Sequence, residues 1–282
     1  MTTAKTAARA GSSAPAQGEA GAPPILITRS GSTLIARLNR PGSRNALSQV
    51  MLAALQTVID EAGADKTVRA IVIAAAGPVF SAGHDLKEIT GHRADADGGK
   101  AFTTLLVAQC SHVMRSIMRC PKPVIAAVEG TATAAGCQLV ATCDLAVAAD
   151  TARFSTPGVN IGLFCSTPMV ALTRNVSRKH AMEMLMLGEF IDAAHAAEFG
   201  LVNRVVPAER VLEEALALAQ TIASKSGAIV KIGKETFYRQ IDMTVDAAYD
   251  YTSQVLVENM LHRDAAEGIG AFIEKRDPKW SE

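Results

Sequence analysis

The sequence of 282 residues has no excess of charge of either sign. Lys and Arg together number 28, and Asp and Glu together also number 28, so the formal net charge at pH 7 is zero. Chains whose main partner is nucleic acid or an anionic membrane surface usually carry a basic excess. The sequence also has no apolar run of about 20 residues, the length that a membrane-spanning helix needs. We therefore expect neither nucleic acid nor a membrane as a partner.

The cysteines do not form a pattern that indicates a disulfide framework or a zinc site. There are five, an odd number, and no two of them are spaced as C-x-x-C. Such cysteines are typical of reduced thiols in an intracellular protein. We therefore expect a cytoplasmic protein without a bound metal ion.

Residues 1–23 also lack what a folded core requires. They are mainly Ala, Gly, Ser, Thr and Pro, a composition that cannot bury enough apolar surface to fold. We expect a disordered tail. Lys5 and Arg9, with no acidic residue before Glu19, also resemble an organelle transit peptide. In that case the location would be mitochondrial.

From Pro24 onward, strand-like and helix-like segments alternate. Buried strands are predicted at 25–30, 32–39, 69–75, 123–130 and 144–150, and helices at 46–63, 100–119 and 135–142. This alternation indicates an α/β fold with a largely parallel, covered sheet. After about residue 165 the sequence is mostly helical. We divide the folded part into a core at 24–205 and a helical section at 206–282.

The stretch "VFSAGHDLKEI" (79–89) places small residues between a buried strand and the start of a helix. A second stretch, "VEGTATAAGCQLVATCD" (128–144), does the same, with its helix starting near Ala135. Small residues allow a ligand to approach the backbone, and the N–H groups at a helix start face whatever lies beyond the strand. Two backbone N–H groups that converge on one point form an oxyanion hole.

These stretches resemble the crotonase, or enoyl-CoA hydratase/isomerase, family over residues 25–280. The resemblance also rests on "LNRPGSRNALS", "ARFSTPGVNIGL", "AAEFGLVNRVVP" and "EGIGAFIEKRDPKW". Within the family, the chain is most similar to the subgroup of enoyl-CoA hydratase domain-containing protein 3. The resemblance implies a spiral ββα core with a C-terminal helical trimerisation section, assembled as a homotrimer or a dimer of trimers. It also implies an acyl-CoA substrate in fatty acid metabolism, with coenzyme A as part of the substrate and no separate cofactor.

The resemblance further implies roles for particular residues. The N–H groups of His84 and Ala135 would hold the thioester oxygen, while the His84 imidazole would either face the acyl group or simply pack. The substrate would contact residues along a coenzyme A channel and, from a neighbouring subunit, residues near the C-terminus: Ser43, Arg44, Ala46, Ser81, Ala82, Asp85, Leu86, Phe272 and Lys275.

Two positions depart from the pattern of the family's hydratases. Those enzymes use two glutamates as base and acid, and the corresponding positions here are Gln138 and Gly158. An amide does not exchange a proton near neutral pH, and glycine has no side chain. Because each general acid or base contributes roughly 10²–10⁴ in rate, we expect weak hydration and regard enzyme activity as undecided.

Three functions stay open at this point: an altered hydratase, another acyl-CoA enzyme such as a decarboxylase or thioesterase, and a non-catalytic acyl-CoA binder. Asp85 and Glu88 are better explained as helix-start residues than as bases. Cys165, just before a predicted helix start, would have a lowered thiol pKa if the helix N-terminus acted on it. Its alternative role is that of a small buried filler. Asp144 is expected to cap the preceding helix or to bond locally.

Overall fold

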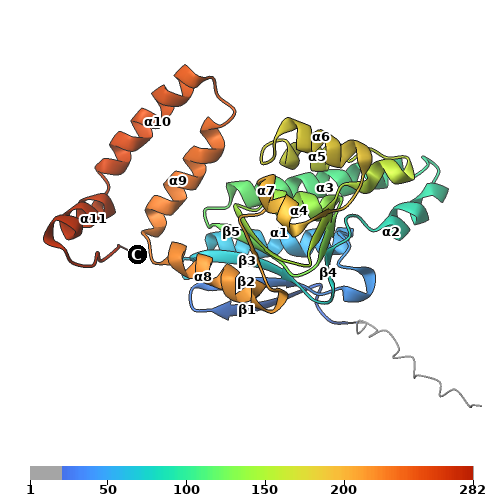
Figure 1. Ribbon diagram of the computed structural model, residues 1–282, viewed down its shortest axis with the longest axis horizontal. Helices are drawn as coiled ribbons and strands as arrows, with labels where there is room; N and C mark the ends of the chain where they lie inside the picture. The colour runs from blue at the N-terminus through green and yellow to red at the C-terminus, as the bar shows by residue number, and fades with distance from the viewer. Residues whose placement is uncertain (1–20, 282) are drawn as a thin grey trace, which may run out of the picture.

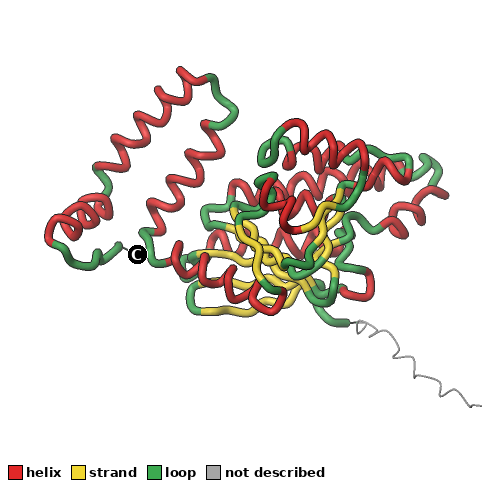
Figure 2. Tube along the Cα trace, viewed as in Figure 1, coloured by secondary structure: helices red, strands yellow, loops and turns green. Residues whose placement is uncertain are grey.

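The computed structural model describes residues 21–281, so the predicted tail lies almost entirely outside the described part. Its main element is a six-stranded sheet (Figures 1 and 2). In spatial order the strands are β1 (Ile25–Ser30), β2 (Thr33–Leu38), β3 (Ala70–Ala75), β5 (Val124–Val128), β7 (Leu145–Ala149) and β10 (Arg204–Val206).

The six-stranded sheet is largely parallel, as the alternation of elements predicts. Only β1 and β2 pair antiparallel, and all other neighbours pair parallel. Every residue of β3 and β5 is buried. This is the pattern of strands covered on both faces, which explains their continuous apolar sequences.

A second sheet contains four short strands, of which the sequence pattern indicated only the first. They are β4 (Val79–Ser81), β6 (Thr131–Thr133), β8 (Arg153–Ser155) and β9 (Ile191–Asp192). In three successive units a strand of the large sheet, β3, β5 or β7, is followed by a short strand and then by a helix. This arrangement confirms the expected ββα core. Strands of two or three residues are too short to show the alternation of apolar and polar residues by which a strand is predicted.

Helices cover the large sheet. On one side α8 (Val211–Ala223) packs against β3, β5 and β7, while α1 (Gln49–Ala64) packs against α3 (Lys100–Arg119). The other helices of the core are α2 (Leu86–Gly91), α4 (Ala135–Thr142), α5 (Ser166–Leu172), α6 (Arg178–Leu187) and α7 (Ala193–Glu198). The expectation that Gly63 ends the first helix is wrong, since the helix continues through Ala64.

The last three helices form a C-terminal arm, α9 (Gly227–Gln240), α10 (Val245–Met260) and α11 (Arg263–Glu274), that extends away from the core (Figure 1). Helix α10 has no buried residue. The arm exposes many large apolar side chains, among them Val245, Tyr249, Leu256, Val257, Met260, Leu261, Phe272 and Ile273. Although these helices are apolar, no helix within residues 21–281 is both long and apolar enough to cross a bilayer.

The arm is joined to the core through a buried ion pair. Lys234 on α9 donates hydrogen bonds to the Ile117 carbonyl (2.9 Å), the Lys122 carbonyl (3.0 Å) and the Asp144 carboxylate (2.6 Å). Asp144 also accepts hydrogen bonds from the Val124 N–H (2.7 Å) and the Tyr238 hydroxyl (2.9 Å). The expectation that Asp144 bonds only locally is therefore wrong, because two of its donors come from the arm.

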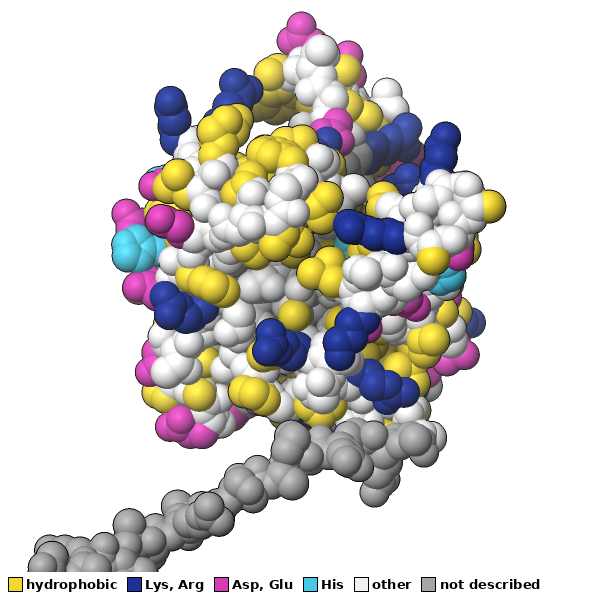
Figure 3. Space-filling model, turned by 90° about the vertical axis from the view of Figure 1, so that its right-hand side faces the viewer, with side chains coloured by type: hydrophobic (Ala, Val, Ile, Leu, Met, Phe, Trp, Pro, Cys, Tyr) yellow, Lys and Arg dark blue, Asp and Glu magenta, His cyan; other side chains and the backbone are white. Residues whose placement is uncertain are grey.

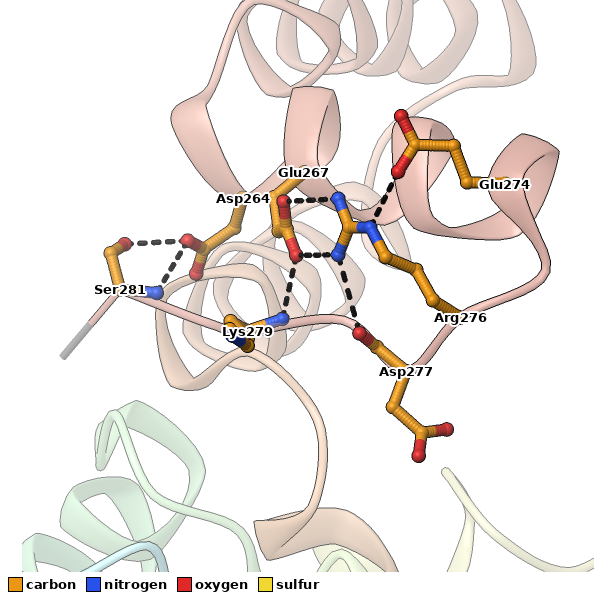
Figure 4. Close-up of polar contacts among 7 residues, drawn as sticks. All are labelled: Asp264, Glu267, Glu274, Arg276, Asp277, Lys279 and Ser281. Atoms are coloured by element: carbon orange, nitrogen blue, oxygen red, sulfur yellow. Dashed lines mark hydrogen bonds and ion pairs between the residues drawn. The ribbon is translucent and has the colours of Figure 1, made fainter.

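The end of the chain folds back against α11 (Figure 4). Glu267 accepts two hydrogen bonds from Arg276 and one from the Lys279 N–H (2.7 Å). Asp264, 1% exposed, accepts hydrogen bonds from Ser281 and from Ser226, the residue that caps α9. These contacts connect the far end of the arm to its beginning.

Candidate active site

Two loops, one after β4 and one after β6, lie against each other without room for side chains between them. A Cβ atom added to Gly83 would lie 2.9 Å from the Ala134 Cβ and 3.2 Å from the Ala135 nitrogen. A Cβ on Gly136 would lie 2.3 Å from the Ser81 carbonyl oxygen. Glycine is therefore required on both sides of the contact. The structure brings together the two small-residue stretches that the sequence singled out.

Each loop presents a backbone N–H group without a partner. Within residues 21–281, neither the N–H of His84 nor that of Ala135 donates a hydrogen bond to the protein. Ala135 is the first residue of α4, whose N-terminal end carries a partial positive charge. Two free donors on touching loops can stabilise negative charge that develops on an oxygen atom between them.

The loop of Ala135 is held in an unusual conformation. Ala134 has φ 50° and ψ −120°, a region that residues with a Cβ atom rarely adopt. Its N–H donates to the Ser155 carbonyl (2.9 Å), which fixes the loop to β8. Such a conformation costs about 1–3 kcal/mol and persists where the surrounding structure enforces it.

Asn45, which no sequence pattern indicated as a site residue, fixes the segment that leads into the loop of His84. Asn45 is fully buried with φ 50°, and its amide donates to the carbonyls of Ala76 (2.9 Å) and Val79 (2.7 Å). Its side-chain oxygen accepts from the Arg40 N–H (2.8 Å). Asparagine tolerates positive φ better than most residues. The Asn in "SRNAL" could therefore have indicated a left-handed backbone position here.

Further bonds join the same segment to the first loop. The Ala82 N–H donates to the Arg44 carbonyl (3.0 Å), and the Leu47 N–H donates to the Gly83 carbonyl (2.7 Å). The buried Ser81 hydroxyl donates to the Asn45 carbonyl (2.9 Å). The strand-end loop is thus fixed before any ligand binds.

The His84 side chain packs against the segment before α1. It is half-buried, and its Nδ1 lies 3.2 Å from the Leu47 carbonyl oxygen, so Nδ1 carries the proton and donates there. Burial lowers the pKa of His84 below its ordinary value, and the Leu47 carbonyl and Glu88 offset this only in part. The imidazole is therefore neutral near pH 7 and leaves Nε2 as an acceptor.

Asp85 and Leu86 begin α2. The Asp85 carboxylate accepts hydrogen bonds from the N–H groups of Lys87 (2.9 Å) and Glu88 (3.2 Å), which makes it the helix cap. Leu86 is 51% exposed. The structure confirms the expectation that Asp85 is a helix-start residue, because its carboxylate is bound by these two N–H groups.

Gln138 lies one turn beyond Ala135 on α4. It is 4% exposed, and its side-chain oxygen has no hydrogen-bond partner in the described part of the chain. Its backbone carbonyl accepts from the Thr142 hydroxyl (2.7 Å). A buried oxygen without a donor is uncommon, because leaving one unpaired is unfavourable by about 1–3 kcal/mol.

Gly158 and Cys165 share one small space. A Cβ atom on Gly158 would lie 2.9 Å from the Cys165 sulfur and 3.0 Å from the Leu163 carbonyl oxygen. Gly158 itself does not adopt a left-handed backbone conformation. The sulfur of Cys165 therefore limits the room available to a side chain at position 158.

Of the two roles considered for Cys165, the structure favours the small buried filler over a nucleophile with a lowered thiol pKa. Cys165 precedes α5, but it is buried, and burial raises the pKa of its thiol more than the Gly158 N–H lowers it. The thiol is therefore protonated near neutral pH, where it is a weak nucleophile.

The residues expected to contact coenzyme A occupy two distant parts of the chain. Ser43 and Arg44 are exposed and Ala46 is buried, all three beside the first loop. Phe272, 85% exposed, and Lys275, the residue that ends α11, lie on the arm. The arm extends away from the core, so the structure does not bring these two residues to the loops of the same chain (Figure 1).

The surface that carries α2 is rich in basic side chains. Figure 3 shows Lys and Arg across the middle of this face, with hydrophobic side chains between them and most acidic side chains near its edges. Such a distribution favours an anionic ligand with apolar parts. No group of three or more potential metal ligands occurs within residues 21–281.

Comparison with known proteins agrees with the resemblance noted in the sequence. A family model described as enoyl-CoA hydratase/isomerase matches residues 28–282. The rat protein named enoyl-CoA hydratase domain-containing protein 3, mitochondrial, is 50% identical over 244 residues, which cover 86% of this chain and 80% of that protein.

Solved structures are similar over nearly the whole chain. The human enoyl coenzyme A hydratase domain-containing protein 3 has a TM-score of 0.87 at 47% identity, covering 91% of this chain and 100% of that chain. An enoyl-CoA hydratase from Mycobacterium smegmatis has a TM-score of 0.87 at 48% identity, covering 92% and 99%. The two-sheet α/β core with its C-terminal helices is therefore a fold already seen in these proteins.

Proposed function

The chain belongs to the enoyl-CoA hydratase/isomerase family, and from that premise we propose that it binds acyl-CoA thioesters at the two touching loops. The thioester oxygen accepts hydrogen bonds from the N–H groups of His84 and Ala135. The single observation that supports this assignment most is that both N–H groups lack a partner within residues 21–281 while the loops that carry them are in direct contact. These donors would also stabilise an enolate or another oxyanion formed from the thioester.

Hydration of an enoyl-CoA would be slow in this protein. Gln138 and Gly158 occupy the positions of the two glutamates that family hydratases use. Gln138 orients a water molecule or hydroxyl without exchanging a proton with it. Asp85 caps α2, and Glu88 accepts from the Gln49 N–H (3.2 Å), so these two nearby carboxylates already have structural partners. Binding without rapid hydration is the expected behaviour.

A second candidate is an acyl-CoA reaction that needs an enolate but no carboxylate base. Decarboxylation is such a reaction, because loss of carbon dioxide itself generates the enolate that the two N–H donors stabilise. The observation that favours it is that the two N–H donors have no partner within residues 21–281, while the nearby Asp85 and Glu88 carboxylates are engaged with backbone N–H groups and are not free to act as bases. A thioesterase or a non-catalytic acyl-CoA binder would use the same donors.

Coenzyme A would lie along the exposed residues next to the first loop. Ser43 and Arg44 flank it on one side, and Ala82 and Leu86 lie on the other. The basic face around α2 supports this route, because the phosphates of coenzyme A are anionic (Figure 3). Affinity should then decrease as the salt concentration rises.

The arm would complete the site of a neighbouring subunit in a homotrimer or a dimer of trimers. Helix α10 has no buried residue, and the arm's exposed apolar side chains form a surface of the kind that mediates association. In such an assembly Phe272 and Lys275 of one subunit would reach the coenzyme A of the next. Analytical ultracentrifugation should detect trimers or hexamers at micromolar concentration, and a monomer alone would contradict the assembly.

The cellular location remains a choice between the cytoplasm and the mitochondrion. The rat and human relatives are named as mitochondrial proteins. The segment that would act as a transit peptide, residues 1–20, lies outside the described part. A fluorescent fusion of the full chain, compared with one that starts at residue 21, would distinguish the two locations.

The test of the proposed function is a panel of thioesters assayed for both binding and turnover. Calorimetry with butyryl-CoA and butyrate should show binding of the thioester only. Crotonyl-CoA and methylmalonyl-CoA are then assayed for hydration, decarboxylation and release of free coenzyme A. Binding without turnover supports the non-catalytic binder, and turnover of one member identifies the reaction. Equal, negligible affinity for butyryl-CoA and butyrate would overturn the proposal.

A further inference from the structure

We propose that a surface pocket between α6, β9 and α7 binds a free amino acid with an apolar side chain. The pocket has a volume of about 290 Å³, and its lining includes Arg153, the carboxylates of Glu183 and Glu189, and the apolar side chains of Leu187 and Phe190. That volume equals roughly ten water molecules at about 30 Å³ each, which suits a ligand of the size of leucine. None of the lining residues belongs to the thioester site, so the inference goes beyond the proposed function.

One wall of the pocket is apolar and open to solvent. Leu187 and Phe190 are both exposed although they are large apolar residues. The ring of Phe199 is held between two histidines, stacked on His180 with centroids 3.6 Å apart and edge-on to His195 at 6.1 Å. A hydrocarbon side chain that covers Leu187 and Phe190 would remove apolar surface from water. The pocket therefore favours a ligand that has an apolar part.

Arg153 provides a cationic partner for the ligand. It is the first residue of β8, it is exposed, and its guanidinium lies over the Phe190 ring, 5.4 Å from the centroid. The ion pairs that arginines form within residues 21–281 do not include Arg153. Its cross-strand neighbour Asp192 instead accepts hydrogen bonds from the N–H (2.9 Å) and the ring Nδ1 (2.8 Å) of His195. The guanidinium can therefore bind a ligand carboxylate through two parallel hydrogen bonds.

Glu183 and Glu189 provide anionic partners. Both are exposed, and the ion pairs that glutamates form in the described part of the chain do not include either of them. Glu183 lies on α6 one turn before Leu187, and Glu189 directly precedes Phe190, so both carboxylates adjoin the apolar wall. An ammonium group has three hydrogens to donate, and carboxylates accept them. Together with Arg153, these residues offer a partner to each charge of a zwitterion.

The backbone around the pocket is fixed by side chains that follow β8. The Thr156 hydroxyl donates to the Met184 carbonyl (2.9 Å). The Gly188 carbonyl accepts from the Ser155 hydroxyl (3.1 Å) and from the Asn160 amide (3.3 Å). A pocket that is already formed loses less affinity to the ordering of its own chain when a ligand binds. A small ligand can therefore bind here without a rearrangement of the core.

The test is calorimetry with leucine and with three analogues that each lack one of its features. Isocaproate lacks the ammonium group, isoamylamine lacks the carboxylate, and glycine lacks the apolar side chain. Leucine should bind with a dissociation constant of about 1 mM, as expected for a ligand of this size in an open pocket. Isocaproate and isoamylamine should each bind about tenfold more weakly, because each loses one charge-assisted contact. Glycine should give no measurable binding.

Substitutions assign each contact to its residue. Arg153→Met should weaken leucine binding about tenfold and leave isoamylamine binding unchanged, since the amine has no carboxylate for Arg153 to bind. The double change Glu183→Gln with Glu189→Gln should weaken leucine and leave isocaproate unchanged. Arg115→Met is the matched control. Arg115 is an exposed arginine on α3 that forms no ion pair within residues 21–281, and its replacement should alter no affinity.

Four results would overturn the inference. They are no binding of leucine, isoamylamine as tight as leucine, isocaproate as tight as leucine, and glycine as tight as leucine. All four are measured on the unmodified chain, so they decide the matter even if a variant does not fold. No thioester is present in these experiments. Failure here therefore leaves the proposed thioester site untouched, and failure of that site leaves this inference standing.

Discussion

Replacing Lys234 by Met should release the arm from the core without unfolding the core. The Lys234 ammonium has three hydrogens, and all three are donated, two to backbone carbonyls and one to Asp144. The side chains of Lys234 and Asp144 are only 7% and 17% exposed. Met fills a similar volume but provides no donor.

The size of the expected destabilisation follows from the hydrogen bonds that Asp144 keeps after the substitution. Removing one partner of a buried ion pair is unfavourable by about 3–5 kcal/mol, because the other charge stays buried. Asp144 would keep its bonds from the Val124 N–H and the Tyr238 hydroxyl, so the lower value of about 3 kcal/mol is expected. A loss of that size decreases the protection of an amide against exchange by about a hundredfold.

Hydrogen exchange with mass spectrometry measures the protection of amides in each segment of the chain. Peptides from α9 should lose about two orders of magnitude of protection in Lys234→Met, while those from β3 and β5 stay unchanged. Lys231→Met is the matched control. It lies on the same helix, is exposed and makes only a 3.8 Å contact with Glu235, so its effect should stay below about 0.5 kcal/mol.

Two outcomes would show that the reasoning is wrong. The first is equal protection of α9 in Lys234→Met and Lys231→Met. The second is a further loss when Asp144→Asn is added to Lys234→Met, because removing the lone charge should restore part of the stability.

Three other predictions follow from single residues. Ala134→Gly should raise the free energy of unfolding by about 1 kcal/mol in thermal or urea denaturation, since glycine adopts φ 50° and ψ −120° without strain; Ala132→Gly, in strand β6, is the control and should destabilise. The pKa of His84 lies below 6.5 because of burial, so as the pH falls below 6.5 the unfolded chain takes up a proton before the folded chain does and stability decreases. That decrease should be smaller in His84→Gln, and identical pH profiles would contradict it. Burial alone would raise the pKa of Asp264, but hydrogen bonds from Ser226 and Ser281 outweigh it and lower the pKa to about 2. Its stabilising contribution is therefore present above about pH 4 and lost as the pH falls toward 2, a loss that acid titration should find reduced in Asp264→Asn.

Much of the fold could be predicted because its main elements are long and strongly patterned. Strands β3 and β5 are continuous apolar runs, and the helices of the arm have clear starts and ends. The short strands β6, β8 and β9 could not be predicted, because they are defined by pairing with distant segments and not by their own two or three residues. Sequence periodicity reports local structure, and these strands are a property of the tertiary fold.

In the candidate site, too, features set by local sequence could be predicted and features set by distant contacts could not. The touching loops could be predicted, because two small-residue stretches, each after a buried strand, form a more specific pattern than either stretch alone. The role of Asn45 and the distant partners of Asp144 could not, since both depend on segments tens of residues away. The choice between the two roles of Cys165 could not be made from the sequence, because its position before a helix is visible there and its burial is not.

The tight fit between Gly158 and Cys165 constrains how this chain could change over evolutionary time. A descendant that acquired glutamate at position 158 would place its first side-chain carbon 2.9 Å from the sulfur and 3.0 Å from the Leu163 carbonyl. That single step would be destabilising unless the sulfur or the Leu163 backbone moved. A smaller residue at 165 would have to arise first or at the same time, together with a shift of the Leu163 backbone. Any side chain at position 158 therefore depends on a second change nearby, so the order in which such mutations arise matters as well as their number.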